Sequence, residues 1–227
     1  MYMEVSIIED KNIIKYIQEA DKVLSEMKFT EHNLAHVTKV SQLSSYILSE
    51  LGYSDYEVNL VKIASYLHDI GNIINRHNHP HYSALLAHDL LSNRDFTLEE
   101  IFKIMSAVGN HDESSGKPVS PISAALIIAD KSDVRRSRVR KLDIKQFDIH
   151  DRVNYAVDKS ELIVNKEEKT ILLKLQLNTK YSSIMEYLSI FSTRMKFCEE
   201  AANYLNMKFG LQINDTILFG GNAWETV

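Results

Sequence analysis

Cysteine, tryptophan, proline and glycine are scarce in this 227-residue chain, which has one Cys, one Trp, three Pro and seven Gly. The lone cysteine, Cys198, cannot form an internal disulfide, so no such bond holds the fold together. So little Pro and Gly excludes collagen-like and low-complexity chains, which are rich in both. Hydrophobic residues make up 44% of the chain and charged residues 25%, which is typical of a globular protein rich in helix.

Long apolar runs and an excess of positive charge are also lacking. No run approaches the length that spans a membrane, and the N-terminus lacks the basic flank and apolar stretch of a signal peptide. The net charge of -5 argues against broad nucleic-acid binding, which needs a positive field over much of the surface. We therefore expect a cytoplasmic protein with no membrane partner and no broad nucleic-acid binding.

Apolar residues recur at three- and four-residue steps over the first two thirds of the chain, which predicts a series of helices. Ser54 with Glu57 has the spacing of a capping box, and Gly52 is typical of a helix end. Thr97 with Glu100 predicts another capped helix. The predicted helices cover residues 11–27, 36–51, 55–69, 82–91 and 98–108, and a sixth opens at 121 and continues through the basic stretch to about 142.

The pattern changes after about Leu142. The segment ELIVNKEEKTILLKLQLN, residues 161–178, alternates apolar and polar side chains on either side of a charged turn, which predicts two strands. A long helix over residues 184–205 follows, and GLQIN favours a further short strand. We therefore predict a mainly α protein: a helical bundle over residues 1–145 and a small α+β domain over residues 146–227.

Histidines and aspartates stand near the ends of several predicted helices. Such mixed nitrogen and oxygen ligands suit a divalent metal ion, and a helical bundle can supply them from separate helices. Neighbouring side chains on a helix point about 100° apart, so His68 and Asp69 can face one cavity only at a helix end. Gly71 would let the backbone turn sharply there. The candidate ligands are His36, His68, Asp69, His79, His111 and Asp130.

The order of these motifs resembles the HD-domain superfamily of metal-dependent phosphohydrolases over about residues 31–140. HVTKVSQLS is similar to the family's first-histidine helix, YLHDIGN to its His-Asp motif, and HPHYSALLA, VGNHDE and ADKSD to the three segments that follow. The resemblance implies an HD bundle of about six helices. It also implies hydrolysis of a phosphate ester by metal-activated water, the substrate being a nucleotide or another small phosphorylated metabolite.

The resemblance also implies roles for the candidate ligands. His36, His68, Asp69 and Asp130 would bind a first ion and His79 and His111 a second, so that one or two ions of Mn, Fe, Mg or Ni are expected. The implied catalytic residues are His68, Asp69, His79 and His111. His32, one helical turn before His36, is either a further ligand or a hydrogen-bonding residue.

The chain departs from one branch that it otherwise resembles. HDIGN and HDESSGKP are similar to the cyclic-dinucleotide phosphodiesterases called HD-GYP. Asn72, however, stands where that branch usually has lysine, and no Gly-Tyr-Pro follows Gly116. We therefore do not expect a cyclic dinucleotide as the substrate.

Residues just after Asp130 are candidates for substrate binding. Lys131 and Arg135 would contact a phosphate, because cations, and arginine above all, pair well with its oxygens. Asp133 would bind substrate, orient a metal ligand, or pair with Lys131 or Arg136. Two alternative functions stay open: a di-iron oxygenase, and a metal- or nucleotide-binding sensory module without turnover. A homodimer is open as well.

Overall fold

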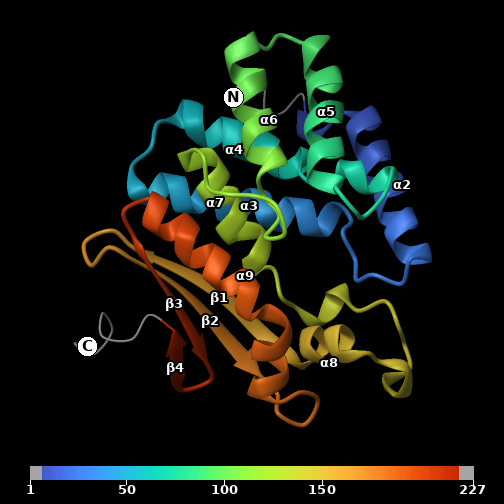
Figure 1. The fold of residues 1–227 in the computed structure, drawn as a ribbon, viewed down its shortest axis with the longest axis vertical. Coiled ribbons are helices and arrows are strands. Elements are labelled where there is room, and N and C mark those ends of the chain that lie inside the picture. Colours follow the sequence, from blue (N-terminus) through green and yellow to red (C-terminus); the bar gives the residue numbers. More distant parts are fainter. Residues whose placement is uncertain (1–6, 220–227) are drawn as a thin grey trace.

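The computed structural model describes residues 7–219, which form a mainly helical bundle above a small mixed sheet (Figure 1). None of the helices in that range is long and apolar enough to cross a membrane. The bundle contains α2 (Lys11–Glu26), α3 (Leu34–Leu51), α4 (Asp55–Leu67), α5 (His79–Ser92), α6 (Leu98–Gly109) and α7 (Pro121–Ser132). Three short 3₁₀ helices join these and later elements: η1 (Ile70–Ile73), η2 (Arg136–Arg138) and η3 (Ile144–Gln146).

Local capping signals set the ends of the bundle helices, as predicted. Both capping boxes are present: the Ser54 side chain accepts from the Glu57 backbone at the start of α4, and Thr97 accepts from Glu100 at the start of α6. Gly52 ends α3 in the left-handed conformation, with φ of 82°. These signals fix where α3 and α4 meet, and so where His36 and His68 can approach each other.

Two boundaries differ from the prediction. Helix α5 begins at His79, three residues before the predicted start, so this histidine is the first residue of a helix and does not lie in the loop before it. The first turn of α5 tolerates Pro80, because a backbone N–H at this position would have no acceptor within the helix. Helix α7 ends at Ser132 and does not continue through the basic stretch, because the backbone of Asp133 leaves the helical region with ψ of 71°. The Arg138 guanidinium donates to the Asp133 carbonyl at 2.8 Å and holds this turn.

The C-terminal segment forms a four-stranded sheet in the order β1-β2-β3-β4. The strands β1 and β2 pair antiparallel, β2 and β3 parallel, and β3 and β4 antiparallel. As predicted, Leu173, Leu175 and Leu177 are buried while the intervening side chains are exposed. The strands are β1 (Val157–Asn165), β2 (Thr170–Leu177), β3 (Lys208–Ile213) and β4 (Thr216–Phe219).

Two helices link the sheet to the bundle. Helix α9 (Ile184–Tyr204), the predicted long helix, connects the parallel strands β2 and β3 and packs against both β3 and α7 (Figure 1). Helix α8 (Ile149–Ala156) was not predicted; its short capped turn begins at Asp148, with Asp151 completing the box. Buried side chains of both predicted units lie in one hydrophobic cluster. The boundary near residue 145 stays a prediction.

Candidate metal centre

Six predicted ligands converge where the bundle helices end. His36 lies in the first turn of α3, His68 ends α4, Asp69 precedes η1, and Asp130 lies in the last turn of α7. Five of the six are buried, and the Asp130 side chain is only 12% exposed. We call these residues the donor cluster: His36, His68, Asp69, His79, His111 and Asp130.

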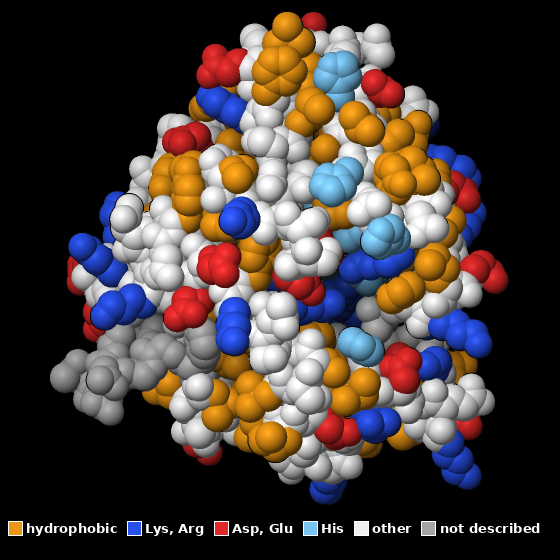
Figure 2. Space-filling model, in the orientation of Figure 1, with side chains coloured by type: hydrophobic (Ala, Val, Ile, Leu, Met, Phe, Trp, Pro, Cys, Tyr) orange, Lys and Arg blue, Asp and Glu red, His pale blue; other side chains and the backbone are white. Residues whose placement is uncertain are grey.

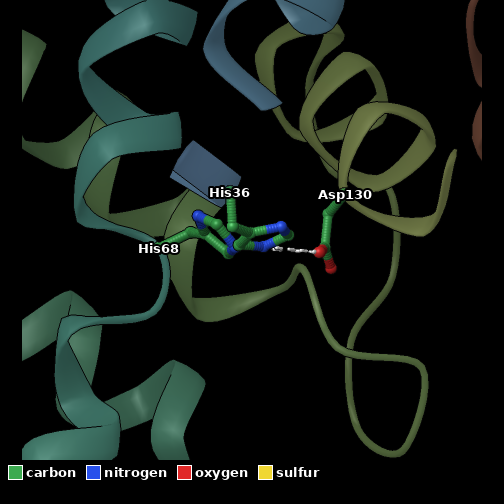
Figure 3. Close-up of side chains that lie close together, drawn as sticks. All are labelled: His36, His68 and Asp130. Carbon is green, nitrogen blue, oxygen red and sulfur yellow. Dashed lines mark hydrogen bonds and ion pairs between the residues drawn. The ribbon is translucent and has the colours of Figure 1, made fainter. Parts of the chain in front are cut away.

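One half of the donor cluster, the first subsite, contains four predicted ligands. His36 Nε2 lies 3.3 Å from His68 Nε2, 3.3 Å from Asp130 Oδ1 and 3.6 Å from Asp69 Oδ2. Figure 3 shows the rings of His36 and His68 side by side, with the Asp130 carboxylate reaching toward them from α7. Ligand atoms around one ion with bonds of about 2.1 Å lie roughly 3.0–3.4 Å apart. His36, His68 and Asp130 therefore form a group whose spacing could hold one ion, and Asp69 lies beside this group.

The other half, the second subsite, uses the opposite oxygen of Asp69. Asp69 Oδ1 lies 3.3 Å from His79 Nε2 and 3.8 Å from His111 Nε2, and these two nitrogens are 3.1 Å apart. His68, Asp69 and His111 also have the spacing of a metal-binding group. The carboxylate of Asp69 thus faces both halves, as a residue bridging two cation positions would.

Hydrogen bonds around the cluster aim every histidine at its centre. A carbonyl or carboxylate oxygen can only accept, so each Nδ1 donates outward and the lone pair of a neutral ring is left on Nε2. The acceptors are the carbonyls of Ser65, Arg76 and Val108 for His68, His79 and His111, at 2.7, 3.0 and 2.6 Å, and Asp133 Oδ2 for His36, at 2.7 Å. Such outer contacts are typical of histidines that bind metal.

The two acids of the cluster lie next to groups that stabilise their negative charge. Burial acts to raise the pKa of Asp69 and Asp130, but nearby charges, of His68 at Asp69 and of Lys131 at Asp130, together with hydrogen bonds from histidines hold both pKa values well below the usual range. Burial likewise opposes a charge on His68, but the carboxylates of Asp69 and Asp130 outweigh it and raise the pKa of His68 to about 10. Burial lowers the pKa of His111 to about 4, so its ring is neutral at pH 7, as a ligand must be. His68 and Lys131 therefore supply the positive charges beside the two buried acids, and a metal ion bound at His68 Nε2 would take the place of its proton.

The three predicted substrate-binding residues already have partners beside the cluster. Lys131 is buried, and its Nζ forms ion pairs at 2.8 Å with Asp130 Oδ2 and at 2.7 Å with Glu113 Oε2. Arg135 donates to Asp133 Oδ1 at 2.8 Å. Asp133 contacts His36, and although burial acts to raise the pKa of Asp133, this hydrogen bond and the charge of Arg138 keep it low. Their contacts with a substrate stay predictions.

His32 lies next to the cluster. Its Nδ1 donates to the Thr30 carbonyl at 2.8 Å, and its ring meets that of His36 edge to face with centroids 5.3 Å apart. No metal-binding group among residues 7–219 includes His32. Burial and the charge of Arg138 hold the pKa of His32 well below its usual range, so the ring is neutral. The hydrogen-bonding alternative is therefore present in the structure, and the role of His32 as a ligand stays a prediction.

Gly71 positions the cluster for a different reason than the predicted sharp turn. Its φ is not in the left-handed region. A Cβ at this position would instead lie 2.3 Å from the His79 carbonyl oxygen and 2.4 Å from the Ser83 nitrogen. The Gly71 N–H donates to Ser83 Oγ at 2.8 Å. Only glycine therefore allows η1 to approach α5 closely enough to bring Asp69 beside His79.

Sequence reasoning missed two residues of the site, Asn72 and Arg76. Asn72 Nδ2 donates to the Asp69 carbonyl at 2.8 Å and to Asp69 Oδ1 at 3.0 Å, which holds the Asp69 carboxylate in place. Arg76 places Nη1 3.4 Å from His79 Nε2, at the mouth of the second subsite. No spacing rule singles out either residue, because both roles depend on how the loop after η1 folds back.

A pocket opens over the donor cluster. Besides cluster residues it is lined by the segment before α3, by Arg76, and by residues of α8 and α9 that include Asn154 and Arg194. Figure 2 shows a hollow in which Lys and Arg side chains lie deep, with His side chains around it. The pocket therefore places the donor cluster next to a wall that carries both basic and acidic side chains.

Comparisons with known proteins show which family and which proteins this chain resembles. The family model described as HD domain matches residues 33–152, more than half of the chain, and this range includes the whole donor cluster. An uncharacterized protein of Methanocaldococcus jannaschii is 24% identical over a 225-residue alignment that covers 82% of this chain and 86% of that protein. The crystal structure of a predicted HD superfamily hydrolase from an uncultured Thermotogales bacterium has a TM-score of 0.45 and 23% identity, covering 56% of this chain and 68% of that one.

Proposed function

Because this chain belongs to the HD domain family, we propose that it is a metal-dependent phosphohydrolase that cleaves a phosphate ester of a nucleotide or another small phosphorylated metabolite. The observation that carries the proposal is the donor cluster itself. Four histidines turn Nε2 inward, and the two oxygens of Asp69 face the two halves separately. Imidazole and carboxylate together suit Mn, Fe, Ni or Mg in the first subsite. A bound divalent ion there would activate water and neutralise charge on the phosphoryl oxygens.

The chain's own residues prepare the site for an anionic substrate. Lys131 holds the outer oxygen of Asp130, so the other oxygen stays directed at His36. Arg76 and Arg194 add positive charge to the pocket wall, where guanidinium groups can pair with phosphate oxygens. Asn72 keeps the carboxylate of Asp69 in place. These groups bind, orient and balance charge, and none needs to form a covalent intermediate.

A cysteine nucleophile is not favoured. Cys198 is fully buried on α9, and burial raises the pKa of its thiol, so the reactive thiolate does not form near neutral pH. The hydrolysis proposed here therefore depends on water and on the donor cluster.

The test is phosphate release by protein stripped with a chelator and reloaded with Mn²⁺, Mg²⁺, Ni²⁺ or Fe²⁺. The substrates are nucleoside monophosphates, sugar phosphates and a simple phosphodiester. We expect release with at least one metal and one substrate class, and release at the metal-free level for Asp69→Ala and His68→Ala. His88→Ala is the matched control, because His88 is a histidine of α5 whose side chain is 40% exposed and lies outside the donor cluster.

Two results would contradict the proposal. If the metal-loaded protein releases no phosphate from any of these substrate classes, the cluster binds metal but does not catalyse hydrolysis. Oxygen consumption by the iron-loaded protein, lost in Asp69→Ala, would assign the cluster to oxygen chemistry instead. Loss of activity in His88→Ala equal to that in Asp69→Ala would show that the assay reports damage to the fold rather than the metal site.

A further inference from the structure

We propose that Arg76 occupies the second cation position of the donor cluster, so that one divalent ion binds tightly and the guanidinium provides the positive charge beside it. This inference rests on the proposed metal site and adds to it the number of ions and the residue that sets that number. Arg76 follows η1 and reaches back over the second subsite with its side chain 23% exposed.

The second subsite consists of acceptor atoms that face one another. His79 and His111 each donate from Nδ1 to a backbone carbonyl, so both direct Nε2 inward, 3.1 Å apart. Asp69 Oδ1 completes the group at 3.3 Å from His79 Nε2. Lone pairs this close repel one another unless a donor or a cation lies among them.

Arg76 supplies that donor. Its Nη1 lies 3.4 Å from His79 Nε2, 3.4 Å from Asn72 Oδ1 and 3.9 Å from Asp69 Oδ1. A guanidinium has only N–H donors, so His79 Nε2 must be the acceptor in this contact. A lone pair that accepts from Arg76 cannot bind a metal ion at the same time. The guanidinium and a second ion therefore compete for the same nitrogen.

The two subsites also differ in negative charge. The first has an oxygen of Asp69 and an oxygen of Asp130 near His36. The second has only the shared carboxylate of Asp69 at close range. Asp112 Oδ2 is farther away, at 4.0 Å from both His79 Nε2 and Arg76 Nη2, so it also faces the guanidinium. A second divalent ion would have to displace the guanidinium of Arg76. It would also meet less negative charge in the second subsite than the first ion meets in the first subsite.

The surroundings hold Arg76 at this place without neutralising it. Its guanidinium carbon lies 5.7 Å from the centre of the Phe29 ring, a cation–π contact. Its distances to the carboxylates of Asp69 and Asp112 are 3.9 and 4.0 Å, which is long for an ion pair. The guanidinium thus keeps donors for a phosphoryl group bound beside the first ion.

Titration with Mn²⁺, followed by calorimetry and by electron paramagnetic resonance, tests the assignment without any substrate. We expect wild-type protein to bind one Mn²⁺ tightly and to give the signal of an isolated ion. In Arg76→Ala we expect a second Mn²⁺ to bind at least tenfold more tightly than in wild type and to give the signal of a coupled pair. Arg76→Lys keeps the charge and should behave as wild type, and His111→Ala in the Arg76→Ala background should abolish the second ion.

The outcomes separate this inference from the function on which it rests. If wild type binds two Mn²⁺ with similar affinity, or if Arg76→Ala leaves the second affinity unchanged while one ion still binds, Arg76 does not hold the second position and the metal site stands. If wild type binds none of Mn²⁺, Mg²⁺, Ni²⁺ and Fe²⁺ in the same titration, both the assignment and the proposed function are wrong. Thermal unfolding of each variant confirms that the titrated protein is folded.

Discussion

At the scale of single residues, Asp133 is the group that orients His36. Its Oδ2 accepts from His36 Nδ1 at 2.7 Å, while Arg135 donates to the other oxygen. Without this acceptor the imidazole can rotate, and its Nε2 no longer stays directed at the first subsite. We expect Asp133→Ala to weaken Mn²⁺ binding by about 10- to 100-fold, the usual effect of removing such a partner, as measured by calorimetric titration.

Two variants control for this prediction. Asp133→Asn keeps an oxygen that can accept from His36 and should weaken binding less than Asp133→Ala does. Arg135→Ala removes a partner of Asp133 but leaves the contact with His36, so its affinity should stay close to wild type. Equal affinities in wild type and Asp133→Ala would show that His36 keeps its orientation without the acid.

The position of Gly71 has no room for a side chain. In Gly71→Ala the added methyl would overlap the His79 carbonyl and the Ser83 nitrogen, both of which are backbone atoms. We expect a loss of about 1–3 kcal/mol in the free energy of unfolding, as for overpacking, together with weaker metal binding because His79 is displaced. Urea denaturation and Mn²⁺ titration measure the two effects.

Gly109 provides the matched control for Gly71. It ends α6, and a Cβ there would lie 3.6 Å from the Cβ of Ala84, which is ordinary contact. Gly109→Ala should therefore be neutral or stabilising by up to about 1 kcal/mol, since alanine restricts the unfolded chain. If both alanine variants lost the same stability, the close approach at Gly71 would not explain its effect.

Among single residues, the sequence predicted the candidate ligands but not Asn72 and Arg76, which contact them. Metal ligands are few in kind and stand in ordered motifs, so the convergence of His36, His68 and Asp130 could be predicted from residue type and helix ends. Asn72 and Arg76 carry no such signal, because an amide or a guanidinium in a loop is usually solvated. Their roles depend on the backbone after η1, which no local pattern determines.

At the scale of elements, one acid ties α2 to the end of α5. Asp10 caps α2, accepting from the backbone nitrogens of Asn12 and Ile13, and its other oxygen pairs with Arg94 at 2.6 Å. Helix α2 packs against η1, which follows Asp69 directly. Asp10→Ala should cost about 1 kcal/mol for the lost cap in addition to the ion pair, whereas Asp10→Asn keeps the cap and loses only the ion pair. Urea denaturation distinguishes the two.

The same acid predicts a pH dependence. The hydrogen bond from Arg94 lowers the pKa of Asp10 in the folded protein, although partial burial opposes the shift. The folded state therefore binds the proton less readily than the unfolded chain. The stabilisation is fully present above the unfolded pKa of about 3.9 and is lost as pH falls through the folded value. The stability difference between wild type and Asp10→Asn should accordingly be constant near pH 7 and vanish in strong acid. A difference that persists there would assign it to something other than the charge.

Helices and strands with strong local sequence signals formed where the sequence predicted them. Ser54 and Thr97 begin helices as their capping boxes predicted, and the alternation around Leu175 gave a strand with one buried face. Helix α8 was missed because it is only eight residues long and mostly polar, and its box uses Asp148 and Asp151 rather than Ser or Thr with Glu. The early end of α7 depends on contacts of Asp133 with Arg138, five residues on, and with His36, which is 97 residues away in sequence.

At the scale of the whole molecule, a chain of charges connects the sheet-covering helix to the donor cluster. Arg194 of α9 pairs with Glu113 at 2.9 Å, Glu113 with Lys131 at 2.7 Å, and Lys131 with Asp130 at 2.8 Å. Burial acts to lower the pKa of Lys131, but these acids outweigh it and raise that pKa, so the ammonium stays charged. Packing of α9 on α7 therefore contributes to the position of a predicted metal ligand, and the C-terminal segment supports the site as well as lining its pocket.

Such a buried cluster links metal binding to the stability of the entire fold. An ion that binds the folded chain but not the unfolded one stabilises it by about 2.7 kcal/mol at a concentration 100 times its Kd. For a chain of this size that corresponds to a rise in Tm of roughly 5–11 °C. We expect this rise when Mn²⁺ is added to chelator-treated wild type, and equally in His88→Ala. In Asp69→Asn the carboxylate shared by the two subsites is gone, so Mn²⁺ should leave the Tm nearly unchanged. An equal rise in Asp69→Asn would mean that Mn²⁺ stabilises the protein elsewhere, because no other acid among the described residues faces both halves of the donor cluster.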